Sequence, residues 1–278
     1  MGNLQYLRFG FLGLAALLAV ALGWGQMRQI GPGPRPVPQA IALRAPAPAF
    51  APATGELLAE RALVEGRLGE ARDYGGFARK FAAAWPADWS NLIDDIARAR
   101  LGGAPVETPD AWLTQALREL RRGRGVLAAR ASAPALARVF ETQAATLAAL
   151  SAIDKRQCVD FLLGVQNRTF LDFSARNRAL IASMAEAALE AIIDGQTSKI
   201  KRAPPGDEDF DLLERALLAK GLGKPEIDAL LDGRHPDPPL PDETLCAAGQ
   251  TYLAVLGSLP EETRMRLYAF AVELMAKL

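Results

Sequence analysis

The feature that most constrains this 278-residue chain is an uncharged apolar run close to its first residue. The run begins at Phe9, its most apolar part ends at Trp24, and the next charged residue is Arg28. A membrane-spanning helix needs about 17–25 predominantly apolar residues, and aromatic side chains such as Tyr6 and Trp24 are common at the membrane interfaces. The sequence therefore predicts a single N-terminal transmembrane helix, with residues 1–28 as a membrane anchor.

Two other interpretations of this segment stay open. The positive charge of Arg8, the apolar run and the small residues Ala19, Val20 and Ala21 also fit a signal peptide, whose cleavage would release a soluble protein. A buried core helix of a cytosolic protein is the third interpretation.

The orientation of the anchor follows from the layout of the chain rather than from charge. Arg8 precedes the run while Arg28 and Arg35 follow it, so the positive-inside rule gives no clear answer. Only a few residues precede the run, and most of the chain follows it. We therefore expect a single-pass inner-membrane protein with a cytoplasmic N-terminus and the bulk of the chain in the periplasm.

Proline sets the next segment apart. Seven of the nineteen prolines lie between Gly31 and Gly55, and from Pro32 to Pro38 every second residue is proline. Proline in this pattern excludes helix and favours the extended polyproline II conformation, which makes a semi-rigid spacer. Residues 29–55 are therefore predicted to be a Pro/Ala-rich linker that holds the following domain away from the membrane.

The pattern from residue 56 to residue 278 is helical throughout. Trp89, Leu92, Ile93 and Ile96 show the three- and four-residue spacing of one helix face, and the same spacing recurs along the chain. We therefore predict an all-α fold class, a helical bundle-like domain over residues 56–278. An aromatic stripe is expected to belong to its core: Phe77, Phe81 and Trp85.

Later signals in this region predict one long helix and one exposed loop. Ser174 is expected to cap a helix that runs to Asp194, with Gly195 just beyond its end. Residues 196–206 break the helical pattern and contain two lysines, an arginine and a Pro-Pro pair. They are expected to form an exposed loop and to mark a subdomain border.

Charge and cysteine content narrow the class of partner and the compartment. The chain has 32 basic and 32 acidic residues, and because residues 1–55 hold four arginines and no acid, the rest has 28 basic and 32 acidic residues. This mildly acidic domain argues against nucleic acid as a partner. In an oxidising compartment Cys158 and Cys246 are expected to form a disulfide; two buried free thiols are the alternative.

One segment concentrates polar and aromatic residues, between Gly164 and Arg178. We interpret Arg168, Asp172, Arg176 and Arg178 as a candidate binding surface. The alternative is a corner between two helices that contains an Arg–Asp pair.

Catalytic signatures are absent from the sequence. There is no GxSxG, P-loop or HExxH motif, and the single histidine, His235, lies in a proline-rich loop. We predict no catalytic residue, no cofactor and no metal ligand. The expected function is that of a membrane-tethered cell-envelope interaction or structural protein whose partners are other envelope proteins. The alternatives are a helical cell-wall hydrolase and a soluble periplasmic binding module.

Overall fold

The computed structural model describes residues 55–71, 73–103, 108–165, 167–233 and 236–277. The predicted anchor, almost all of the predicted linker and His235 lie outside these residues. Within them, no helix combines the length and the apolar character needed to cross a membrane.

The described residues form helices and no strand, which confirms the predicted all-α fold class. In chain order the elements are α2 (Gly55–Glu70), α3 (Gly75–Ala84), α4 (Pro86–Leu101), α5 (Pro109–Arg124), η3 (Gly125–Arg130), α6 (Ala133–Ile153), α7 (Lys155–Leu162), α8 (Arg168–Arg176), α9 (Arg178–Ser198), α10 (Asp207–Ala219), α11 (Lys224–Ile227), η4 (Asp228–Asp232), α12 (Asp242–Ser258) and α13 (Glu261–Lys277).

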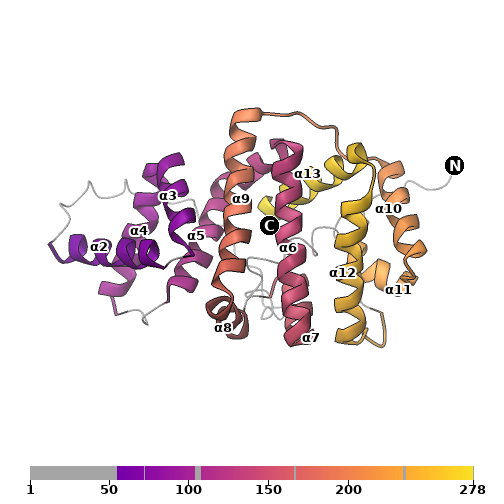
Figure 1. Ribbon diagram of the computed structural model, residues 1–278, viewed down its shortest axis with the longest axis horizontal. Coiled ribbons are helices and arrows are strands. Elements are labelled where there is room, and N and C mark those ends of the chain that lie inside the picture. The colour runs from indigo at the N-terminus through magenta and orange to yellow at the C-terminus, as the bar shows by residue number, and fades with distance from the viewer. Residues whose placement is uncertain (1–54, 72, 104–107, 166, 234–235, 278) are drawn as a thin grey trace, which may run out of the picture.

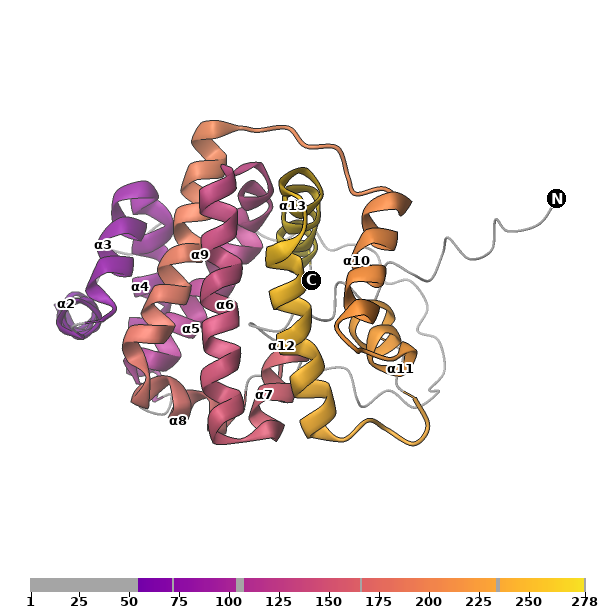
Figure 2. The same ribbon diagram turned by 45° about the vertical axis from the view of Figure 1, so that its right-hand side comes forward.

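The long helices α6 and α9 pack side by side in the middle of the molecule (Figure 1). α2, α3 and α4 lie on one side, where α3 packs against α9, and α12 packs against α6 and α7 on the other side. α10 and α11 lie beyond α12, and the segment that joins α9 to α10 crosses the top of the molecule above α6 and α13 (Figure 2). α13 and α9 both pack against the short helix η3.

A single cluster of buried apolar side chains runs through all of these layers. It reaches from Val64 on α2 to Met275 on α13, and it includes Ile192 and Leu213 on the two sides of residues 196–206. The predicted subdomain border in that segment stays a prediction, but the helices on either side of it share one core. The aromatic stripe is confirmed as part of this core, with edge-to-face contacts between its neighbouring rings: Phe77, Phe81 and Trp85.

The start and end predicted for the long helix α9 are both wrong. Ser174 lies inside α8, where its buried hydroxyl donates to the carbonyl oxygen of Phe170 at 2.8 Å, and Asn177 is the residue at the N-cap of α9. At the other end the helix continues past Gly195 to Ser198, and Lys199 adopts the left-handed conformation with a φ of 51°.

The physical reason for Gly195 is a close approach between α9 and η3. A Cβ atom at this position would lie 1.9 Å from the carbonyl oxygen of Leu127 in η3. Glycine is therefore required here by backbone packing and not by a helix-ending turn.

We predict that Gly195→Ala destabilises the protein while Gly66→Ala stabilises it. An alanine in a helix is normally more stable than glycine by about 0.5–1 kcal/mol, and a Cβ at Gly66 in α2 would meet no atom within 4 Å. At Gly195 the same change forces η3 away from α9, and such overpacking costs about 1–3 kcal/mol. Urea unfolding followed by circular dichroism measures both changes. Equal stabilisation by the two substitutions would contradict the close approach.

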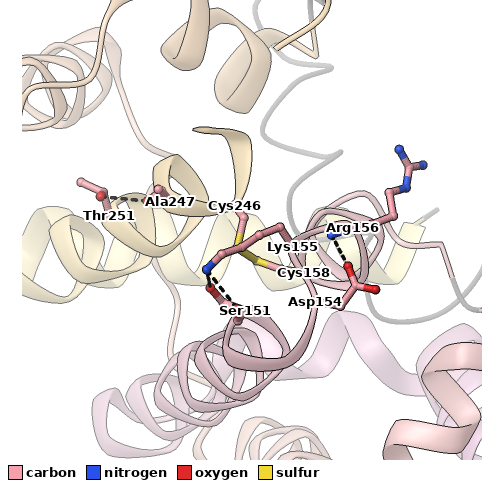
Figure 3. The surroundings of a disulfide bond; sticks show 8 residues. All are labelled: Ser151, Asp154, Lys155, Arg156, Cys158, Cys246, Ala247 and Thr251. Carbon is pink, nitrogen blue, oxygen red and sulfur yellow. Dashed lines mark hydrogen bonds between the residues drawn. A yellow bond between two sulfur atoms is a disulfide. The ribbon is translucent and has the colours of Figure 1, made fainter. Parts of the chain in front are cut away.

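The predicted disulfide is present and joins α7 to α12 (Figure 3). The sulfur atoms of Cys158 and Cys246 are 2.04 Å apart, both residues are fully buried, and 88 residues separate them in sequence. Around the bond, Asp154 caps α7 by accepting a hydrogen bond from the backbone nitrogen of Arg156 at 2.7 Å. The bond therefore fixes a short, capped helix against α12.

We predict that the double variant Cys158→Ala with Cys246→Ala unfolds at a clearly lower temperature than the oxidised protein. A loop of this length gives a disulfide stabilisation of about 4–5 kcal/mol in the chain-entropy model. Because both cysteines are buried, a reductant reaches the bond only when the fold opens, so the variant is a cleaner measurement than added reductant. Identical melting temperatures in the two proteins would show that the bond contributes nothing to stability.

Candidate functional site

The predicted binding surface is divided by the structure. Arg168, Asp172 and Arg176 are exposed and lie four residues apart on α8, so they form one charged stripe, called here the α8 stripe. Arg178 lies outside it, because its guanidinium points to α5 and binds Asp110. No observation assigns a ligand to the α8 stripe, and its role in binding stays a prediction.

Arg178 instead forms an ion pair with the buried Asp110, and this pair connects three parts of the fold. Its Nε and Nη2 atoms donate to the two oxygens of Asp110 at 3.0 and 2.9 Å, and the hydroxyl of Tyr74 donates to the same carboxylate at 2.6 Å. Burial alone would raise the pKa of Asp110, but the hydrogen bonds from Arg178 and Tyr74 outweigh it and lower the pKa. The partner of Arg178 is therefore on α5 and outside the segment 164–178, so this pair is not the one that the alternative interpretation placed within that segment.

A second surface is a groove between η3, the segment 199–204 and α13, and we call it the basic groove. Its volume is about 570 Å³. That size falls within the roughly 300–1,000 Å³ typical of ligand sites. It is lined by Val126, Ala129, Arg130, Lys199, Ile200, Lys201, Arg202, Ala203, Pro204, Arg266, Ala269, Phe270 and Glu273.

One wall of the basic groove is fixed by hydrogen bonds to the carbonyl groups of η3 and of the residue that follows it. The backbone nitrogen of Ile200 donates to Arg130 at 3.0 Å. The guanidinium of Arg202 donates to the carbonyl oxygens of Ala129 and Ala131 at 3.1 and 2.6 Å. The segment that follows α9 is thus held in place, although it has no regular secondary structure.

The lining contains five basic side chains and one acidic side chain, Glu273. Glu273 already binds Lys277, while Arg202 binds backbone carbonyls. In contrast, Arg130, Lys199 and Lys201 are exposed and form no ion pair with any residue that the structure describes. A domain with a net acidic composition therefore carries a local positive surface in this groove.

Apolar side chains lie among these cations. Val126 is 44% exposed and Ile200 is 38% exposed, and both line the groove. Phe270 lines the same groove and packs edge-to-face against Phe210, with their ring centroids 6.2 Å apart. The groove thus offers both positive charge and apolar contact area.

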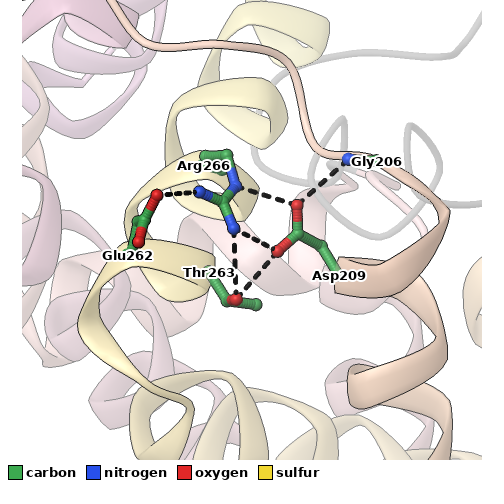
Figure 4. A network of polar contacts seen from close by, with 5 residues as sticks. All are labelled: Gly206, Asp209, Glu262, Thr263 and Arg266. Carbon is green, nitrogen blue, oxygen red and sulfur yellow. Dashed lines mark hydrogen bonds and ion pairs between the residues drawn. The ribbon is translucent and has the colours of Figure 1, made fainter.

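Arg266, which lines the basic groove, is held in an ion-pair network (Figure 4). It donates to both oxygens of Asp209 at 2.8 and 2.7 Å and to Glu262 at 2.6 Å, while Thr263 and the backbone nitrogen of Gly206 also donate to Asp209. The bonds from Arg266 are the main reason that the pKa of Asp209 falls to about 2. This network joins the start of α10 to α13.

We predict that Asp209→Asn removes stability that the native protein has at neutral pH and loses in acid. The pKa of an aspartate in an unfolded chain is about 3.9, above the folded value of about 2. Ionised Asp209 therefore stabilises the fold fully above pH 4, and this contribution is lost as the pH falls toward 2. Melting temperatures from pH 2 to 7 should converge at the acidic end. A constant difference between the two proteins across that range would contradict this account.

Two further hollows lie among the described residues. A cavity of about 90 Å³ between α5, η3, α6, α9 and α13 is lined mainly by apolar side chains such as Met184 and Met275. A second groove of about 420 Å³ contains Asp88, Asp95 and Glu119. Of these, Asp88 binds Arg124 at 2.7 Å.

The helical cell-wall hydrolase named as an alternative stays a prediction. That alternative requires a carboxylate with a raised pKa in a cleft. Within the described ranges, the carboxylates with a clear pKa shift are Asp110, Asp194 and Asp209, and all three are lowered. The same ranges contain no group of three or more side chains suited to bind a metal ion.

Sequence reasoning did not identify the basic groove. The run from Lys199 to Arg202 is visible as a basic segment, but it was expected only to be an exposed loop. Arg130 lies about 70 residues earlier in the chain, and only the packing of η3 against α9 brings the two together.

No protein-family model, no curated protein and no solved structure matches this chain. The function proposed below therefore rests on the basic groove and on the charges and apolar side chains that line it.

Proposed function

We propose that this chain is a membrane-tethered interaction protein of the cell envelope, with no catalytic role of its own. In this proposal residues 1–28 anchor the chain in the inner membrane and residues 29–55 act as a spacer. The helical domain lies in the periplasm, where it binds other envelope proteins.

The disulfide supports the proposed compartment. Disulfides persist in the periplasm and other oxidising compartments and are rare in the cytosol. Cys158 and Cys246 are the only cysteines of the chain, and they are bonded to each other. An exported domain is the setting in which such a bond forms and lasts.

The basic groove is the main support for a binding function. Its wall is fixed by hydrogen bonds, three of its cations have no ion-pair partner among the described residues, and exposed aliphatic side chains lie beside them. The backbone that carries Lys199 and Lys201 is held in place by these hydrogen bonds, so little ordering of the chain is needed when a ligand binds. Exposed apolar area beside them is typical of an interaction surface.

We predict that a photo-crosslinking residue at Val126, in the full-length chain expressed in cells, forms a discrete adduct with another envelope protein. The same residue at Ile153, which is 56% exposed and does not line the basic groove, serves as the matched control and should form none. Adducts at Ile153 but not at Val126, or at neither position, would contradict a partner in the groove.

A further inference from the structure

The geometry of the basic groove points to the chemistry of its partner. We infer that the groove binds an acidic polypeptide segment that presents a large apolar side chain between carboxylates. This inference rests on the proposed function, since it names the kind of partner that the interaction site accepts.

Charge complementarity selects an acidic partner. Arg130, Lys199 and Lys201 face the groove without a described ion-pair partner. The N-terminal residues 1–55 contain four arginines and no acid, so that part of the same chain has the wrong charge to occupy it. A carboxylate from another polypeptide offers each cation a charge-assisted hydrogen bond.

The apolar residues select a polypeptide over the other polyanions. Val126, Ile200 and Phe270 lie among the cations and can enclose one large apolar side chain. Single-stranded nucleic acid is typically bound by several stacking aromatic rings, and the groove contains one, Phe270. A flat anionic bilayer meets a convex surface better than a hollow of about 570 Å³.

Lys199 lies at the C-cap of α9 and adopts the left-handed conformation that commonly ends a helix. It is the only non-glycine residue with a positive φ among those the structure describes. Glycine would fit this turn with less strain, so Lys199→Gly removes a cation from the groove without destabilising the turn.

The experiment measures binding of fluorescent synthetic peptides to the purified full-length chain, oxidised and in nonionic detergent. The test peptide has a central Leu-Phe pair flanked by Asp and Glu. One control peptide replaces the acids with Asn and Gln, and the other replaces Leu-Phe with Ser-Ser. We expect the test peptide to bind, each control to bind at least about tenfold more weakly, and the affinity to fall as salt rises.

Two double variants then locate the site. Lys199→Gly with Lys201→Gln removes two groove cations and leaves a glycine where the backbone favours one, so this variant should be as stable as the native chain. It should bind the test peptide at least about tenfold more weakly. Arg168→Gln with Arg176→Gln removes two cations from the competing α8 stripe and should leave the affinity within about twofold.

Several results would overturn the inference. The test peptide could fail to bind. The Lys199/Lys201 variant could bind it as tightly as the native chain does. Only the Arg168/Arg176 variant could lose binding. Binding of phosphatidylglycerol vesicles or a single-stranded oligonucleotide through Lys199 and Lys201, without the peptide, would assign the groove to another polyanion. If the Val126 crosslink captures a partner while the peptide fails to bind, the proposed function stands and the partner chemistry is wrong. If the peptide binds and no crosslink forms, the partner chemistry stands and the proposed function in the envelope is wrong.

Discussion

The buried bond between Cys158 and Cys246 is the one covalent link between distant parts of this fold. It closes a loop that contains α8, α9, α10 and α11, so the segment 199–204 that forms one wall of the basic groove lies within that loop. The bond is buried between α7 and α12 and is continuous with the single apolar core. The proposed periplasmic location rests on the same bond, because disulfides are rare in cytosolic proteins.

Much of the fold could be predicted from local patterns. The stripe from Phe77 to Trp85 lies in the core as expected, because helical periodicity depends on neighbours within a few residues. Thr108 and Asp154 cap α5 and α7 through hydrogen bonds to backbone nitrogens within three residues, which is a similarly local interaction. The role of Gly195 could not be predicted from such local patterns. Its local signal was that of a helix end, whereas its actual role is set by the backbone of η3, which is distant in sequence.

The candidate site could be predicted only in part, for the same physical reason. Arg178 was singled out, but its partner Asp110 is 68 residues away, and a sequence pattern does not pair residues at that separation. The basic groove likewise forms only where three parts of the chain pack together: Arg130 in η3, the segment that follows α9, and α13. Gly195 permits a close contact between η3 and α9. This contact places the η3 carbonyl oxygens where they accept hydrogen bonds from Ile200 and Arg202. The geometry of the groove therefore depends on the packing of η3 against α9.

The account is tested most directly by the state of the full-length chain in cells, measured by membrane fractionation with intact mass and thiol alkylation of the recovered protein. It predicts a chain that stays with the membrane, keeps its N-terminal segment and has both cysteines blocked against alkylation until it is denatured and reduced. A soluble chain of full length with two alkylatable thiols after denaturation would contradict it, because the anchor, the export and the disulfide would then all be absent.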